Sequence, residues 1–480
     1  MQYEKRKGGF HLRIHVVQQG DTIWKLASIY HTSMIAINQL NQLPNPQELL
    51  IGQAIVIPDT TTPHIIQPGE TFWSLAGTYG VSVQAIQQAN PTVNPYRLIP
   101  GTTIYIPARL YMVQPGETLS IIAAYYGTTI ESIVKQNGLL HPDNIYPGMM
   151  LIIPRPKPSI EVNAYSYQPD ADGAASVNAV GNWLTYFAPF SYMIKEDGTL
   201  KPFEDALMLN AAKSQQAVPM LSISNFSSGN TGSELAHTIL SNQVLREKLI
   251  DCCLQVMEEK GYRGLNIDFE NVLPEDRKNY NAFLELAVNR LHEKGYFVSS
   301  ALAPKASAEQ EGLLYTAHDY EAHGRIVDFV ILMTYEWGWR GGPPQAISPI
   351  YQIRRVVEYA LTVIPPEKIF LGFQIYARDW KIPHTQGNIA ETFSPQEAIR
   401  RAVRYKAEIF YDETAQSPFF RYTDEIGQAH EVWFEDARSA AAKFQLAIQY
   451  NLRGISYWAL GYPFPQNWAL LNDYFDIIKR

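Results

Sequence analysis

The chain has 480 residues, of which 46% are hydrophobic and 18% are charged, and its formal net charge is −8. This composition excludes disorder on a large scale and leaves room for a barrel-sized domain beside smaller modules. The acidic balance argues against nucleic acid or an anionic membrane as a partner, because both would reward a basic surface. The sequence holds neither a membrane-length apolar run nor an apolar run of signal-peptide length after Met1, so we expect no membrane span and no classical signal peptide.

The first third of the chain repeats one pattern three times. The copies open with Gly20-Asp21-Thr22, Gly69-Glu70-Thr71 and Gly116-Glu117-Thr118. A short β-type run precedes each opening and a helical pattern follows it, and each copy ends in a β-rich run. Each copy is therefore predicted to fold as strand, helix, helix, strand, over residues 13–59, 62–108 and 109–155.

These copies resemble LysM modules, small βααβ domains that bind N-acetylglucosamine in peptidoglycan or chitin. The threonine of each opening is typical of a helix cap, and the acid before it favours the helix dipole. By the family pattern, the sugar groove lies between the first helix and the loop after the second. The resemblance places six side chains at the groove rim: Asp21, Thr22, Glu70, Thr71, Glu117 and Thr118. A repeat used only for protein assembly is the alternative.

Short apolar runs alternate with helical patterns from residue 159 onward. Eight such units predict an α/β fold, a (β/α)8 TIM barrel over residues 159–480, with a doubly wound sheet as the alternative. A long connection at 409–432 is predicted to be a small insertion beside the cleft. The strands are expected at 161–165, 183–190, 218–224, 264–270, 298–303, 327–335, 369–376 and 454–458.

The run from Gly264 to Glu270 alternates apolar and polar residues and ends in a carboxylate. Its apolar members are predicted to face a packed layer, while Asn266, Asp268 and Glu270 share the opposite face. Polar groups inside a fold are costly unless they are hydrogen-bonded. Because a TIM barrel gathers its function at the C-terminal ends of its strands, the run predicts an active site. A strand that ends in a solvated Asp-x-Glu by chance is the alternative.

Residues 159–480 resemble glycoside hydrolase family 18, whose fourth strand carries Asp-x-x-Asp-x-Asp-x-Glu. Asp268 and Glu270 match the last two acids, whereas Arg263 and Asn266 replace the first two. The run Met333-Thr334-Tyr335-Glu336 matches the Met-x-Tyr-Asp pattern of strand six, with a glutamate in place of the aspartate. Trp458 matches the tryptophan beneath the sugar that is cleaved.

The resemblance implies that Glu270 protonates the glycosidic oxygen while the 2-acetamido oxygen of the substrate attacks the sugar. Asp268 and Tyr335 are the candidates to orient that acetamide, with Asn266 as a hydrogen-bond partner behind Asp268. The like charge of Asp268 is expected to raise the pKa of Glu270. Neither a metal nor a cofactor is expected. The other predicted substrate-binding residues are Trp458, Glu336, Gln374, Tyr376 and Tyr165.

LysM modules joined to a family 18 domain resemble the spore cortex-lytic enzymes of endospore-forming bacteria. The resemblance implies an N-acetylglucosaminidase that acts on cortex peptidoglycan in the spore cortex, coat or cell wall. Its partner would be an N-acetylglucosamine-containing glycan, and a monomer would suffice. Two alternatives stay open: a chitinase with the same chemistry, and a wall-binding protein that has lost catalysis.

Overall fold

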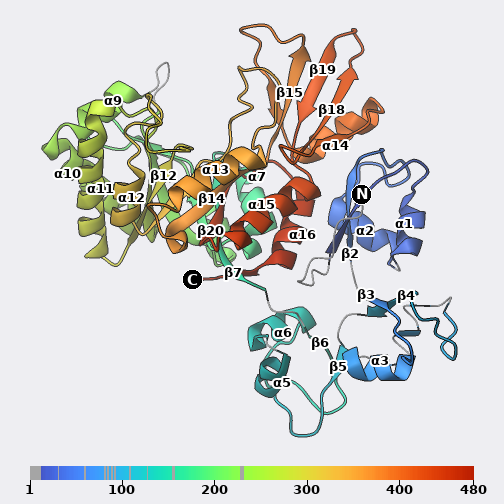
Figure 1. Cartoon of the computed structure of the whole chain (residues 1–480). Coiled ribbons are helices and arrows are strands. Elements are labelled where there is room, and N and C mark those ends of the chain that lie inside the picture. The colour runs from blue at the N-terminus through green and yellow to red at the C-terminus, as the bar shows by residue number, and fades with distance from the viewer. Residues whose placement is uncertain are drawn as a thin grey trace.

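The computed structural model describes residues 12–30, 32–58, 61–79, 83, 86–87, 90, 93–107, 110–126, 128–153, 157–226 and 232–480 (Figure 1). The predicted module ends at 59, 108, 109 and 155 lie outside these residues, as does most of the second helix of the second module. None of the helices within the described ranges has the length and apolarity that crossing a bilayer requires.

Each N-terminal module pairs its first strand with its last in antiparallel fashion. Helices lie between the two strands in sequence, as the repeat pattern predicts. The first module contains β1 (Leu12–Val16), α1 (Ile23–Ile29), α2 (Met34–Asn41) and β2 (Ala54–Pro58). The second contains β3 (Thr61–Ile65), α3 (Phe72–Tyr79) and β4 (Thr103–Pro107). The third contains β5 (Leu110–Met112), α5 (Leu119–Tyr126), α6 (Ile130–Asn137) and β6 (Met150–Ile152).

An asparagine at the same register position, buried in the first two modules and half-buried in the third, hydrogen-bonds within each module. Asn41 donates through Nδ2 to the carbonyls of Ile37 and Val56, and its Oδ1 accepts the N–H of Val56, all at 2.7 Å. Asn90 and Asn137 repeat the bond to the carbonyl four residues earlier, at 2.7 and 2.8 Å. Because buried backbone groups need partners, this side chain fixes the end of the second helix against the last strand in the first module.

Eight parallel strands close into a barrel in residues 159–480. The register runs continuously from one strand to the next and returns to the first, so no strand of the ring is an edge. Two short strands, β9 (Tyr192–Met193) and β21 (Asp476–Ile477), pair with ring members β10 and β7. The ring consists of β7 (Ser159–Ser166), β8 (Tyr186–Pro189), β10 (Val218–Ser224), β11 (Gly264–Asp268), β12 (Phe297–Leu302), β13 (Phe329–Leu332), β14 (Ile369–Gln374) and β20 (Gly454–Trp458).

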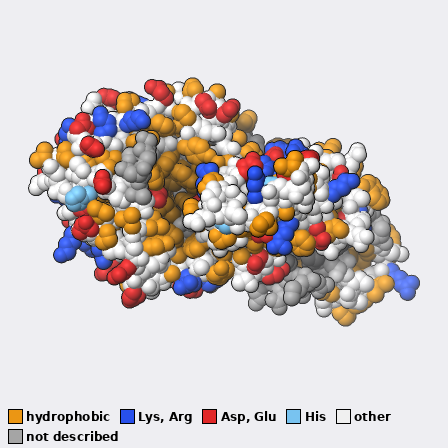
Figure 2. All heavy atoms as spheres, turned by 90° about the horizontal axis from the view of Figure 1, so that it is seen from above, with side chains coloured by type: hydrophobic (Ala, Val, Ile, Leu, Met, Phe, Trp, Pro, Cys, Tyr) orange, Lys and Arg blue, Asp and Glu red, His pale blue; other side chains and the backbone are white. Residues whose placement is uncertain are grey.

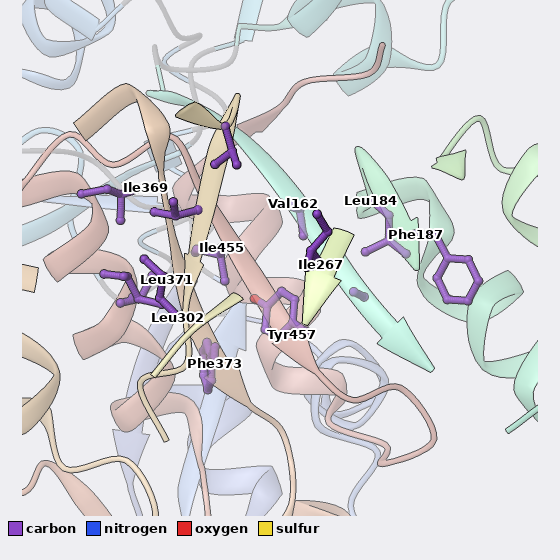
Figure 3. Close-up of a cluster of buried hydrophobic side chains, with 14 of the residues drawn as sticks. Val162, Leu184, Phe187, Ile267, Leu302, Ile369, Leu371, Phe373, Ile455 and Tyr457 are labelled. Carbon is purple, nitrogen blue, oxygen red and sulfur yellow. The ribbon is translucent and has the colours of Figure 1, made fainter. Parts of the chain in front are cut away.

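Helices cover the outside of the barrel. Apolar side chains fill the layer between strands and helices, and Figure 3 shows part of that layer, with Val162, Ile267, Leu371 and Ile455 pointing from different strands. A second cluster fills the barrel itself, where aromatic rings from β8, β13 and β14 pack together. The helices are α7 (Ala171–Val180), α8 (Ala206–Ser214), α9 (Ser233–Leu240), α10 (Gln243–Lys260), α11 (Arg277–His292), α12 (Tyr320–Ile326), α13 (Ile350–Ala360), α15 (Ala437–Gln449) and α16 (Pro465–Tyr474).

The insertion after β14 is larger than the sequence suggests. An antiparallel five-stranded sheet spans residues 377–433, so the predicted segment 409–432 forms only its C-terminal half. The earlier strands were not predicted from the sequence, because the first of them follows β14 almost without a break. The insertion contains β15 (Ala377–Ile382), β16 (Glu391–Phe393), α14 (Pro395–Arg404), β17 (Phe410–Asp412), β18 (Ser417–Thr423) and β19 (Ala429–Trp433).

Candidate active site

The end of β11 carries the predicted pair of carboxyl groups. The apolar residues of the strand face the helices, where Phe269 stacks on Phe283 with ring centroids 5.7 Å apart. Asp268 is buried and Glu270 is half-buried. Figure 2 looks onto this end of the molecule and shows a hollow in which hydrophobic side chains gather, between the α9–α12 side of the barrel and the insertion sheet. The alternation read from the sequence therefore brings two acids to the open end of the barrel.

Asn225 holds the backbone of Glu270 from the neighbouring strand. Its Oδ1 accepts the N–H of Glu270 at 2.9 Å, and its Nδ2 donates to the carbonyl of the same residue at 2.7 Å and to that of Gly232 at 3.2 Å. Asn225 is fully buried. Sequence reasoning missed this residue, although it directly follows the predicted strand 218–224, where a polar residue at a strand end is the available signal.

His318 holds the residue between the two acids. The N–H of Ala303 donates to its Nδ1 at 2.7 Å, so Nδ1 is unprotonated, and Nε2 donates to the carbonyl of Phe269 at 2.9 Å. Burial lowers the pKa of His318 to about 4, which keeps the ring neutral in this tautomer. This role could not be predicted from the sequence, because residue 318 is distant from β11 in the chain.

Both carboxyl groups favour their protonated forms. Burial first, and the negative charge of Glu336 second, raise the pKa of Glu270 to about 7. Burial, with the charge of Glu270 second, raises the pKa of Asp268 well above its ordinary value. We expected the like charge of Asp268 to raise the pKa of Glu270, but the causes of the shift are burial and the charge of Glu336. A carboxyl group that holds its proton near neutrality is suited to act as a general acid.

Glu336 is fixed by the insertion sheet. Arg378 on β15 contacts both of its carboxylate oxygens, with distances of 2.8 and 2.7 Å, and the hydroxyl of Tyr376 donates to Oε1. Tyr376 is buried, whereas the side chain of Glu336 is 40% exposed. Of the two predicted cleft residues, Glu336 therefore faces solvent and Tyr376 supports it. Arg378 was missed, although it stands two residues beyond Tyr376.

Asn266 and Tyr165 lie below the cleft floor. The hydroxyl of Tyr165 donates to Oδ1 of Asn266 at 2.9 Å, and the amide of Asn266 donates to Ser299 Oγ at 3.1 Å. Oδ1 also accepts from Ser222 Oγ at 3.3 Å. These bonds replace the expected hydrogen bond from Asn266 to Asp268. Both residues are buried and hydrogen-bonded to neighbouring strands, so they support the site from beneath, and their contact with substrate stays a prediction.

Gln374 is also buried, which corrects its expected place in the cleft. Its Nε2 donates to Oε1 of Glu435 at 2.7 Å, and its Oε1 accepts from the hydroxyl of Ser348. Glu435 in turn pairs with Lys443 at 2.7 Å, with both side chains almost fully enclosed. The strand end carries Gln374 into this network because the insertion folds over it. Gln374 therefore links β14 to the start of α15.

Asp268 and Tyr335 each keep a polar group available. Oδ1 of Asp268 is buried and has no hydrogen-bond partner among the described residues. Burial, with the charge of Asp268 second, raises the pKa of the Tyr335 hydroxyl, so this hydroxyl keeps a proton to donate. Trp458 at the end of β20 is partly exposed and packs edge-on against Phe190 and Tyr165, with centroids 4.6 and 5.6 Å apart. These three side chains can therefore meet a ligand beside Glu270.

The acids of the three modules are used within their own modules. Asp21 accepts from the N–H of Gln18 at 2.8 Å and contacts His15 at 2.9 Å. Glu70 makes the matching contacts with Gln67 and His64, and Glu117 makes them with Gln114 and Tyr111. These bonds fix the turn before the first helix. The three acids therefore make structural bonds inside their modules, and their place at the glycan rim stays a prediction.

The three threonines that follow those acids cap the first helices, as the sequence predicts. The Oγ1 atoms accept the N–H groups of Lys25, Ser74 and Ile121 at 3.1, 3.0 and 3.3 Å. They belong to Thr22, Thr71 and Thr118. Their hydroxyl groups are thus occupied locally.

A closed parallel barrel with a half-buried glutamic acid and a second carboxyl group at its strand ends defines a TIM-barrel glycosidase-type site. Across the described ranges, no group of three His, Cys, Asp or Glu side chains is arranged to hold a metal ion. Residues 166–462 match glycosyl hydrolases family 18, and residues 15–58, 64–107 and 111–154 match the LysM domain. The chain belongs to glycosyl hydrolases family 18 and carries three LysM domains. The predicted fold class, a (β/α)8 barrel preceded by three LysM modules, is confirmed.

Relatives match the chain over nearly its whole length. The cortical fragment-lytic enzyme of Bacillus subtilis (strain 168) is 46% identical over 98% of this chain and 99% of its own. The crystal structure of the Bacillus megaterium QM B1551 spore cortex-lytic enzyme SleL superposes with a TM-score of 0.82 at 36% identity, over 98% of this chain and 100% of that chain. The Bacillus cereus spore cortex-lytic enzyme SleL gives a TM-score of 0.75 at 39% identity, with the same two coverages.

Proposed function

We propose that this chain hydrolyses spore cortex peptidoglycan as an N-acetylglucosaminidase, with its LysM modules attaching it to the glycan. The observation that carries the proposal is the half-buried Glu270, whose pKa is raised to about 7, beside Asp268 and Tyr335 at the open end of the barrel. The names of the similar Bacillus proteins, a cortical fragment-lytic enzyme and a spore cortex-lytic enzyme, support the choice of substrate. The same relatives support a location in the spore cortex or wall.

In the proposed reaction, Glu270 donates its proton to the glycosidic oxygen as the bond from that oxygen to C1 breaks. The carbonyl oxygen of the 2-acetamido group on the same sugar bonds to C1. Water then attacks C1 as the bond from the acetamide oxygen to C1 breaks, and it gives a proton to Glu270. This restores both the acetamide and the acid and leaves a reducing N-acetylglucosamine. The acceptor chain leaves with the proton that Glu270 supplied.

Asp268 and Tyr335 are proposed to hold the acetamide during this reaction. The unpartnered Oδ1 of Asp268 can accept from the acetamide N–H, and the Tyr335 hydroxyl can donate to its carbonyl oxygen. Such groups must be fixed in advance to contribute to the rate. Trp458 is proposed to lie beneath the sugar ring, and Glu336 is proposed to contact it from the side of the insertion sheet.

The test compares the protein with its Glu270→Gln variant on spore cortex that a lytic transglycosylase or a muramidase has already opened. Mass spectrometry after borohydride reduction identifies the sugar at each new reducing end. New ends that are N-acetylglucosamine, produced only by the parent protein, support the proposal. New muramic acid ends, or equal products from both proteins, contradict it. Chito-oligosaccharides in parallel reactions separate a cortex enzyme from a chitinase.

A further inference from the structure

The first LysM module is joined to the catalytic domain by the loop that follows its second helix. Ile409 donates its N–H to the carbonyl of Ile51 at 3.0 Å, and Arg438 donates to the carbonyl of Gly52 at 3.1 Å. Gln396 donates to the carbonyl of Gln42. The loop therefore contacts the insertion and the start of α15 through its backbone.

A helix of the barrel binds the same module from a second side. Gln466 at the start of α16 donates to Oδ1 of Asn41 at 2.7 Å and to the carbonyl of Ala54 at 2.8 Å. Ala54 and Val56 of β2 belong to the same apolar cluster as the outer core of the barrel. Figure 1 shows α2 and β2 beside α16. The module thus shares hydrophobic core with the catalytic domain.

Packing at the loop leaves no space. Leu50 is 7% exposed and lies in one cluster with Phe393, Ile409 and Phe420 of the insertion. A Cβ placed on Gly52 would lie 1.7 Å from the carbonyl oxygen of Ile409. Only glycine allows the two backbones to approach this closely. The contact between the loop and the insertion is therefore packed as closely as the interior of a domain.

The same positions are free in the other two modules. Ile99 and Tyr146 stand two residues before the register glycines, as Leu50 does, but their exposures are 59% and 64%. A Cβ on Gly101 or Gly148 would meet nothing within 4 Å. Figure 1 shows the second and third modules away from the insertion sheet. One fold thus presents the same loop to protein in one copy and to solvent in the other two.

We propose that the first LysM module is a fixed part of the catalytic unit, and that glycan attachment depends on the corresponding loops of the second and third modules. The occupant of those loops is the N-acetylglucosamine-containing glycan, so this inference rests on the proposed function. Ile99 and Tyr146 are the large side chains that these two loops offer to a ligand, and aromatic rings such as Tyr146 pack on apolar faces. In the first module the catalytic domain already occupies that surface.

A space remains between the docked module and part of the barrel. A cavity of about 760 Å³ between the module and the barrel is lined by Leu40 of α2, Trp468 of α16 and Tyr462 of the loop after β20. The ring of Tyr462 packs against Tyr376 with centroids 5.8 Å apart, and Tyr376 holds Glu336. Loosening the first module should lower thermal stability, because the module shares hydrophobic core and hydrogen bonds with the barrel.

The test uses matched substitutions in the whole 480-residue chain. Leu50→Ser, and the double variant Ile99→Ser with Tyr146→Ser, are made in a Glu270→Gln background for co-sedimentation with insoluble peptidoglycan. Thermal melting is followed for every variant. Gln466→Ala, which removes two hydrogen bonds without opening a cavity at the loop, serves as a milder variant should Leu50→Ser fail to fold.

We expect the double variant to sediment at least tenfold more weakly while melting like the parent. Leu50→Ser and Gln466→Ala should melt at lower temperature and keep the parent's affinity. Parent-like sedimentation of the double variant, or weakened sedimentation of Leu50→Ser with unchanged melting, overturns the inference. If the parent itself does not sediment, the proposed attachment function is refuted. The melting temperatures of the Leu50 and Gln466 variants then still test whether the first module is a fixed part of the catalytic unit.

Discussion

Replacing Asn225 by alanine should slow catalysis without changing any group that meets the substrate. Asn225 makes three hydrogen bonds at the cleft, two to the backbone of Glu270 and one to Gly232, at 2.9, 2.7 and 3.2 Å. Each buried hydrogen bond contributes about 1 kcal/mol, so the free energy of unfolding should fall by about 3 kcal/mol. The freed backbone also releases the acid from its position, and a displacement of about 1 Å can reduce a rate roughly 100-fold.

We therefore expect Asn225→Ala to lower kcat by about 10- to 100-fold and to change KM little, because substrate contacts stay in place. Initial rates on soluble cortex fragments give both constants, and urea titration gives the stability. Thr185→Val is the matched control. It removes two buried hydrogen bonds at the opposite end of the barrel, to Val162 and Ile478, and should lower stability alone. Parent-like kcat for Asn225→Ala, or an equal loss of kcat in Thr185→Val, would refute the reasoning.

Three further outcomes are expected. The ratio kcat/KM should decline as pH rises through about 7, the pKa of Glu270. Glu336→Gln should move this decline to lower pH, because it removes a negative charge that raises the pKa of Glu270. An unmoved pH profile would exclude Glu336 as a cause of the raised pKa. The pKa of Glu270 is higher in the folded state than in the unfolded state, so its protonation stabilises the fold fully at pH values below the unfolded-state pKa. This stabilisation is lost as pH rises through about 7. Glu270→Gln should therefore flatten the dependence of melting temperature on pH over this window. Lys443→Met should lower the free energy of unfolding, measured by urea titration, by about 3–5 kcal/mol, because it leaves the buried Glu435 without its positively charged partner. A loss below about 1 kcal/mol, roughly the value of an exposed ion pair, would show that the site is open to water.

The barrel could be predicted because its strands are local patterns in the chain. Each of the eight ring strands falls within or beside a predicted run, and β11 matches its predicted alternation of apolar and polar residues. The insertion could not be delimited in this way. β15 begins three residues after β14 ends, so nothing in the local pattern separates a barrel strand from the first strand of a second sheet.

The acids of the site could be predicted because one strand carries them both. Asn225, His318 and Arg378 come from three other segments, and their contacts with β11 or Glu336 depend on the closed barrel and on the insertion folding over it. The burial of Gln374 and Tyr165 could not be predicted from the sequence for the same reason. Both stand at strand ends, as a cleft residue would, but neighbouring elements cover them.

For the acids of the three modules, the sequence pattern predicted the local structure but not the contacts of the carboxylates. The pattern of glycine, acid and threonine correctly predicted helix caps, and it carried no information on whether the carboxylate was free. The structure shows that each carboxylate is engaged by the residue three positions before it and by a side chain of the first strand. A repeated polar residue can therefore mark a structural bond shared by every copy.

The most direct test of the proposed chemistry compares two soluble muropeptide substrates that differ only at the donor sugar, one carrying N-acetylglucosamine and the other glucosamine with a free amine. If the acetamide attacks C1 while Glu270 supplies the proton, only the acetylated substrate is cleaved, and proton NMR of the first product shows the retained β-anomer. Comparable cleavage of both substrates, or an α-anomer formed first, would contradict participation of the acetamide and the assigned roles of Asp268 and Tyr335.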